Sequence, residues 1–165
     1  MEMVRNMKHI LMFMALAASA FAADFTLAIG SPIAASLPGT ENPPGSSAAR
    51  KVKDAAFAVR TEGCDHPAEA LITATAESLV NGVRQSAALR LVPGSGPGVY
   101  LVSSGWMAQG VLVVRLIASC GSAKAGALVP IGPGGFIRES SKFFPRFATE
   151  ADIEASLKSL AGGAK

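Results

Sequence analysis

The chain has 165 residues, of which half are hydrophobic and 16% are charged. This length suits one domain, and the hydrophobic content excludes a disordered polyelectrolyte. The formal net charge of +3 comes from scattered basic residues without basic runs or interleaved aromatic residues, a composition that excludes a typical nucleic-acid-binding domain. Seventeen Gly and ten Pro favour a β-rich fold with many turns.

Residues 1–22 have the pattern of a secretory signal peptide: a basic start, an apolar stretch over residues 10–18, and small residues at Ala20 and Ala22. The apolar stretch is short for a membrane span, although an uncleaved N-terminal anchor is the alternative. No Cys follows the cleavage site, as a lipoprotein anchor would require. We therefore expect a periplasmic or secreted protein that begins at Ala23 and has no membrane span after cleavage.

After cleavage the chain keeps two cysteines, Cys64 and Cys120, and one histidine, His66. An even number of cysteines in an exported chain predicts a disulfide, and two cysteines allow one intramolecular pairing. The alternative is a soft-metal site for copper built from Cys64, His66 and Cys120, with Met107 as a further ligand. We predict the disulfide, with His66 on an exposed turn beside it and no metal or cofactor.

Six short strands are predicted in the middle of the chain, and no segment of helical period interrupts them. Asn81-Gly82 predicts a tight hairpin, and the alternation before it places Glu77 on the polar face of its strand. Residues 111–120 are apolar at nearly every position, which favours a central strand. Pro130 favours an edge for the last strand. The predicted strands cover residues 55–63, 69–80, 83–92, 98–103, 111–120 and 125–131.

The flanks of this core differ from it in composition. Residues 23–51 are predicted to be a flexible lead and linker rich in Pro, Gly and Ser, within which residues 24–29 are either a short strand or a disordered lead. Residues 52–135 form the predicted β domain. Residues 136–165 contain an aromatic-rich segment and a C-terminal helix capped by Thr149. We expect this helix to dock on the sheets, with a partner-binding or membrane-surface helix as the alternative. Its apolar stripe consists of Ile153, Leu157 and Leu160.

The chain lacks the common motifs for catalysis. The glycine-rich stretches 94–98 and 132–135 lack the spacing of a dinucleotide or phosphate loop, and each contains a Pro that removes a backbone N–H group. A Ser nucleophile elbow and an S-x-x-K motif are both missing from the sequence. The carboxylates of Glu62, Asp65 and Glu69 cluster near one turn, which leaves a carboxylate-dependent hydrolase as an alternative. We therefore expect that the protein is not an enzyme and has no catalytic residue.

One stretch resembles a known family. Pro97-Gly98-Val99-Tyr100, then Trp106, then residues 110–114 are similar to exported bacterial immunoglobulin-like domains, including those of copper-handling and cytochrome-oxidase-assembly proteins. These domains often read Pro-Gly-x-Tyr, a hairpin and Gly-x-aromatic-x-Val. Here Leu112 replaces the usual aromatic residue, and the His/Met cluster for copper is missing. Trp106 is either a ligand-stacking platform or a packing residue.

The resemblance implies a mainly β, immunoglobulin-like antiparallel β-sandwich, to which the sequence adds a short C-terminal α-helix. It transfers no site residue. The expected function is a non-enzymatic binding or accessory module of the cell envelope, with an unknown envelope protein or ligand as partner. The alternatives are a copper-binding or carrier protein and a carboxylate-dependent hydrolase.

Overall fold

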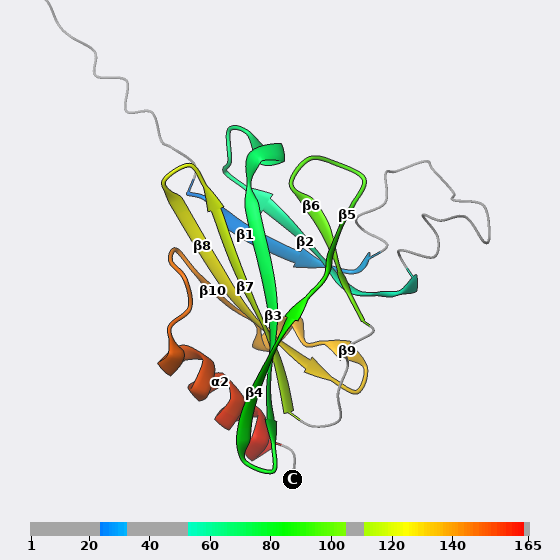
Figure 1. Cartoon of the computed structure of the whole chain (residues 1–165), viewed down its shortest axis with the longest axis vertical. Helices are drawn as coiled ribbons and strands as arrows, with labels where there is room; N and C mark the ends of the chain where they lie inside the picture. Colours follow the sequence, from blue (N-terminus) through cyan, green and yellow to red (C-terminus); the bar gives the residue numbers. More distant parts are fainter. Residues whose placement is uncertain (1–23, 33–52, 105–110, 164–165) are drawn as a thin grey trace, which may run out of the picture.

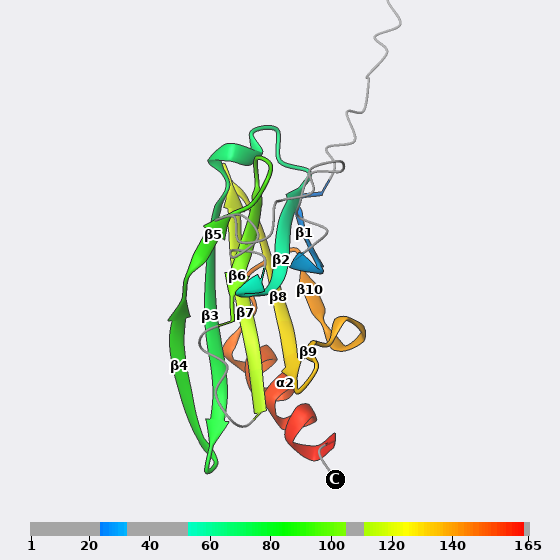
Figure 2. The ribbon, with the colours of Figure 1, turned by 90° about the vertical axis from the view of Figure 1, so that its right-hand side faces the viewer.

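The computed structural model describes residues 24–32, 53–104 and 111–163, which form two antiparallel sheets packed face to face, with one α-helix on the outer side of the larger sheet (Figures 1 and 2). The first sheet contains, in spatial order, β1 (Thr26–Gly30), β2 (Ala55–Glu62), β6 (Val99–Ser103) and β5 (Leu91–Pro93). The second contains, in spatial order, β10 (Lys142–Phe144), β8 (Ala123–Gly132), β7 (Val111–Cys120), β3 (Leu71–Val80) and β4 (Val83–Leu89); β9 (Gly135–Phe136) also pairs with β8. The remaining elements are the 3₁₀ turns η2 (Pro67–Glu69) and η3 (Arg138–Ser140) and the helix α2 (Glu150–Gly163).

The main core lies between the two sheets. Side chains on alternate positions of each strand face it, as the predicted period of two requires. Phe57 and Val59 of β2 and Val114 and Leu116 of β7 are fully buried there. This arrangement confirms the predicted mainly β class, with two antiparallel sheets and a C-terminal helix.

The predicted hairpin at Asn81-Gly82 is confirmed. Both residues have positive φ, +52° and +77°, as a type I′ turn requires. Val80 pairs with Val83 across the turn, and the β3–β4 register then runs without a bulge to Ala74 opposite Leu89. The hairpin reaches beyond the first sheet at one end of the molecule (Figure 1).

The prediction of one strand over residues 83–92 is wrong in one respect. The chain leaves the second sheet after Leu89 and enters the first sheet at Leu91, so the segment contributes β4 to one sheet and β5 to the other. At the crossing, the N–H of Ser103 donates to the carbonyl of Arg90 at 3.3 Å. The apolar alternation continues through the crossing because both strands face the same core, and the sequence pattern therefore hides the change of sheet.

The expected flexible lead contains a strand. β1 pairs with β2 over its whole length, from Thr26 opposite Glu62 to Gly30 opposite Ala58. The alternate residues Phe25, Leu27 and Ile29 are buried in the main core. Of the two readings of residues 24–29, the structure thus shows the strand, and the folded unit begins before residue 52. Residues 33–51 of the lead and the predicted signal peptide over residues 1–22 lie outside the described residues.

Pro130 does not lie on an edge strand, which corrects a second expectation. β8 is central, between β7 on one side and β9 and β10 on the other. The carbonyl of Pro130 accepts a hydrogen bond from the N–H of Ile137 at 2.8 Å, so the backbone groups of Pro130 point away from β7. Along β8, the residues that pair with β10 stop at Leu128, and those that pair with β9 start at Ile131. The nitrogen of Pro130, which has no N–H to donate, therefore faces the gap between these two short strands, where no hydrogen bond is lost.

Helix α2 begins at a capping box. The N–H of Thr149 donates to Asp152 Oδ2 at 2.8 Å, and the N–H of Asp152 donates to Thr149 Oγ1 at 3.3 Å. Arg146 adds an ion pair to Asp152 at 2.8 Å. The hydrogen bonds from Arg146 and Thr149 hold the pKa of Asp152 well below its usual range. The predicted cap at Thr149 is confirmed.

The expected docking of the helix on the sheets is also confirmed. Ile153 and Leu157 are fully buried against Val113 of β7 and Leu128 of β8, and Leu160 packs at the margin of this second core. The helix thus adds a third layer outside the second sheet, at one end of the molecule (Figure 2). In the part of the chain that the structure describes, every helix is too short or too polar to cross a membrane.

The turn geometry at Gly82 gives a first prediction. Gly82→Val is expected to lower the free energy of unfolding by about 1–3 kcal/mol, because a β-branched residue is strained at positive φ. Space is not the cause, since a Cβ at Gly82 would meet nothing within 4 Å. Gly134→Ala is the control, because that position is equally open and its φ is not positive. Urea unfolding measures both variants, and equal midpoints for Gly82→Val and the parent chain would contradict the assignment.

Candidate functional site

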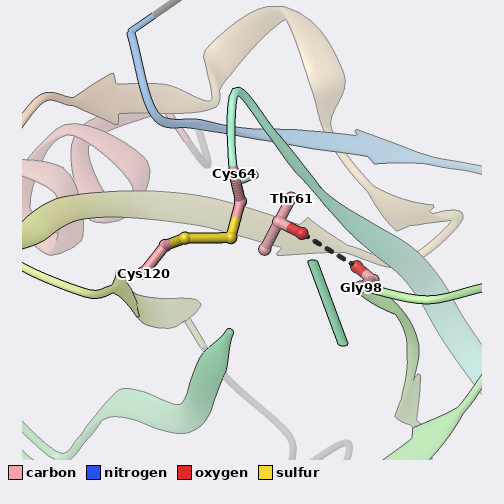
Figure 3. The surroundings of a disulfide bond; sticks show 4 residues. All are labelled: Thr61, Cys64, Gly98 and Cys120. Atoms are coloured by element: carbon pink, nitrogen blue, oxygen red, sulfur yellow. Dashed lines mark hydrogen bonds between the residues drawn. A yellow bond between two sulfur atoms is a disulfide. The ribbon is translucent and has the colours of Figure 1, made fainter. Parts of the chain in front are cut away.

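A disulfide joins the two sheets at one end of the sandwich (Figure 3). Cys64 follows the end of β2 in the first sheet, and Cys120 is the last residue of β7 in the second. Their Cα atoms lie 6.0 Å apart, although the residues are 56 positions apart in the sequence. The predicted pairing is confirmed, and both side chains lie at the margin of the main core.

The turn before β6 is fastened to β2 beside the disulfide. The N–H of Thr61 donates to the carbonyl of Gly98 at 3.0 Å. The hydroxyl of Thr61 donates to the same oxygen at 3.5 Å, as Figure 3 shows. Gly98 has a φ of +71°, and a Cβ on it would lie 2.3 Å from Thr61 Oγ1. Only glycine fits this position without displacing β2. The glycine-rich stretch 94–98 is therefore a structural turn.

The candidate acid–base residues next to the disulfide lie at the surface. Asp65, His66 and Glu69 are exposed on the turn that follows Cys64 and contains η2. Glu62 is exposed at the end of β2 and pairs with Arg60 at 2.6 Å. The carboxylates that the sequence places close together thus face solvent, where water screens their charges.

The soft-metal hypothesis loses two of its ligands. The sulfur atoms of Cys64 and Cys120 are bonded to each other, so neither is available as the thiolate that a soft metal binds. Within residues 24–32, 53–104 and 111–163, no group of His, Cys, Asp and Glu is arranged to hold a metal ion. Met107 and Trp106 lie outside the described residues.

A different group of charged side chains comes together on the outer face of the second sheet, beneath the start of α2. We call it the ionic cluster, and it consists of Glu77, Arg84, Arg115 and Glu150. These residues come from β3, β4, β7 and α2, so the cluster connects three strands to the helix.

Glu77 is the centre of the ionic cluster. Its side chain is fully buried. Its Oε2 accepts a hydrogen bond from Arg84 Nε at 3.1 Å and one from the hydroxyl of Ser86, and its Oε1 lies 3.4 Å from Arg115 Nη2. A buried carboxylate needs such partners, because removal from water is costly for an isolated charge.

Glu150 closes the ionic cluster from the helix side. It forms ion pairs with both Arg84 and Arg115, the latter at 3.6 Å. The hydrogen bond from Arg84 lowers the pKa of Glu150, and the bonds to Glu150 and then to Glu77 raise the pKa of Arg84. Because folding lowers the pKa of Glu150, its contribution to stability is present above its usual pKa and is lost as the pH falls below that value.

The sequence did not predict the ionic cluster, and its alternation placed Glu77 on the polar face of its strand. Its strand face is polar, as expected, but α2 and its two arginine partners cover that position. One signal was available: Arg115 is the single charged residue in the apolar strand 111–120. A lone charge in such a strand indicates a buried partner of opposite sign.

The geometry assigns the ionic cluster a structural role: it fixes the position of the helix on the sheet. Comparison with known proteins adds no assignment, since no protein-family model, curated protein or solved structure matches this chain.

The disulfide leads to a second prediction. When the chain is isolated without reductant, an alkylating reagent is expected to modify no thiol. After reduction the chain should gain two alkyl groups, as measured by intact mass. Reduction should lower the free energy of unfolding by about 4 kcal/mol, because the bond constrains a long loop of the unfolded chain. His66→Ala is the control and should leave stability within about 0.5 kcal/mol, since its side chain is exposed. Two thiols reactive before reduction would refute the pairing.

The ionic cluster leads to a third prediction. Glu77→Ala is expected to lower the free energy of unfolding by about 3 kcal/mol, because it leaves Arg115 and Arg84 without their buried partner. Glu69→Ala removes an exposed carboxylate and should change stability by less than about 0.5 kcal/mol. Chemical denaturation of both variants measures the difference. An equally small effect of Glu77→Ala would show that the buried charge is dispensable.

Proposed function

We propose that this chain is an exported, immunoglobulin-like β-sandwich that acts as a non-enzymatic binding or accessory module of the cell envelope. The observation that carries the proposal is the disulfide between Cys64 and Cys120, which ties the two sheets together. Structural disulfides persist in oxidising compartments and are rare in the cytosol. This agrees with the signal-peptide pattern of residues 1–22.

The order of the strands supports the immunoglobulin-like part of the proposal. Immunoglobulin sandwiches pack strands A-B-E-D against a second sheet with C, F and G, to which variable-type domains add C′. In sequence order β1 to β8 correspond to A, B, C, C′, D, E, F and G, and they lie in the orders β1-β2-β6-β5 and β4-β3-β7-β8. The disulfide then connects strands B and F, as in antibody domains.

Two features depart from the antibody pattern. β10 and β9 pair with β8 and cover the edge that strand G leaves open, and α2 covers the outer face of the second sheet. The hallmark Trp of strand C is replaced, because β3 reads LITATAESLV and contains no Trp. These departures leave the frame intact and change the surfaces that are open to a partner.

The charge arrangement supports binding rather than catalysis. The buried Glu77 and its half-buried partners Arg84 and Arg115 are engaged with one another and with the helix, so these charges stabilise the fold. Asp65 and His66 are exposed on the turn that follows Cys64. A rigid sandwich with such a surface suits non-covalent recognition.

Export and binding can be tested on the full chain produced with a C-terminal tag in a bacterial host. We expect a mature N-terminus at Ala23, recovery outside the cytoplasm and an oxidised cysteine pair, all read from intact mass after fractionation. The oxidised chain should then retain a component of the envelope extract in a pull-down, and the double variant Cys64→Ala/Cys120→Ala should retain less of it. Retention of residues 1–22 on a reduced cytoplasmic chain would refute the proposal.

A further inference from the structure

The edge of the second sheet formed by β4 differs from the other sheet edges that the structure describes. Among the described strands, β4 pairs with β3 alone, and it is seven residues long. The other edge strands are shorter: β1 has five residues, β5 has three and ends at Pro93, and β10 has three and begins at Lys142. Short length, proline and lysine are the usual means by which an edge avoids pairing with another chain. β4 has none of them.

The one charged residue of β4 does not prevent pairing at its edge. Arg84 directs its guanidinium into the ionic cluster, where it binds Glu77 and Glu150. The remaining residues of β4 are small, polar or aliphatic, and the register with β3 has no bulge. Figure 2 shows β4 along one margin of the molecule, on the side away from β8. The strand thus presents an edge without a bulge and without an outward charge.

The hairpin determines which backbone groups of β4 point outward. The type I′ turn closes with a hydrogen bond between Val80 and Val83, so Val83 and every second residue after it bond to β3. Arg84, Ser86 and Ala88 are the alternate residues, and their N–H and C=O groups point to the free side. These three residues are symmetric about Ser86.

We propose that a second copy of this chain pairs with β4 in antiparallel orientation, about a two-fold axis at Ser86. In this register Ser86 meets Ser86 of the second copy, and Arg84 meets Ala88 of the second copy. Every outward backbone group of the three residues then finds its complement. The inference goes beyond the proposed function, because it concerns the assembly of the chain and holds whatever else the module binds.

The side chains favour the same register. On the face toward the main core, Val83 lies opposite Leu89 of the second copy, and Gln85 lies opposite Ala87 of the second copy. Val83 is 63% exposed in the single chain and is one of three exposed large hydrophobic residues in the described part of the chain, so pairing would cover it. A two-fold axis at Arg84 instead would place the two arginines opposite each other, and like charges in that position are destabilising. An isologous contact of this kind closes at a dimer and does not propagate.

Charge substitutions at Gln85 and Ala87 test the pairing. Both side chains are exposed, so the double variant Gln85→Lys/Ala87→Lys should fold with an unchanged melting temperature. It places lysine opposite lysine across the dimer and should weaken self-association at least about tenfold. Gln85→Glu/Ala87→Glu should weaken it likewise, and an equimolar mixture of the two variants should recover the dimer. Thr26→Lys/Leu71→Lys is the matched control, since it adds equal charge at exposed positions away from β4.

Sedimentation equilibrium of the oxidised chain gives the readout. The parent chain and the control should form a reversible dimer. The lysine and glutamate variants at Gln85 and Ala87, each measured without the other, should be monomers. A parent chain that stays monomeric at all concentrations overturns the proposal, as does a dimer that both charge variants leave intact. If the parent chain is monomeric but loses a captured envelope protein on Gln85→Lys/Ala87→Lys, β4 pairs with a different protein. Self-pairing is then wrong while the proposed binding function stands.

Discussion

The structure depends on the burial of β7 on both of its faces. On one face Val114 and Leu116 fill the core between the sheets, and on the other Val113 lies beneath α2. A strand buried on both faces must be apolar at successive positions, and residues 111–120 are so except at Arg115 and near their end. The same strand supplies Cys120 to the disulfide and Arg115 to the ionic cluster. The two cores, the disulfide and the ionic cluster therefore all include residues of β7.

The second core would not by itself determine where the helix lies. An apolar stripe of Ile153, Leu157 and Leu160 on a β surface can shift along the strands at little cost, because hydrophobic contact is not directional. The ion pairs of Glu150 with Arg84 and Arg115 are directional and fix the first turn of α2 above β4 and β7. Burial of Glu77 carries a desolvation cost. Its hydrogen bonds from Arg84 and Ser86 and its ion pair with Arg115 offset this cost in one arrangement of the helix and strands. The polar contacts thus provide specificity where the apolar contacts provide most of the stabilisation.

Much of this fold could be predicted from local patterns. The alternation of apolar residues located β2 and β3, and the nearly continuous apolar run located β7. The Asn81-Gly82 pair located the hairpin, and the cap at Thr149 located the helix. Each of these signals depends on residues that are close together in the chain, so it can be recognised without knowing the tertiary structure. The change of sheet at Arg90 and the central place of Pro130 depend on which strands become neighbours, and the local pattern does not carry that information. The ionic cluster is harder still, because Glu77 and Glu150 are distant in the sequence and meet only after the helix docks.

The ionic cluster also links the interior of the fold to its surface at β4. An arginine on an edge strand ordinarily projects past the edge and discourages pairing with another chain. Here the buried carboxylate of Glu77 and the helix carboxylate of Glu150 bind Arg84 and turn its charge toward the helix. The hydrogen bonds that raise the pKa of Arg84 are the same ones that hold this orientation. Docking of α2 and the exposed, uncharged edge of β4 therefore follow from one set of contacts, and a change in the helix that releases Arg84 would restore a charge to the edge.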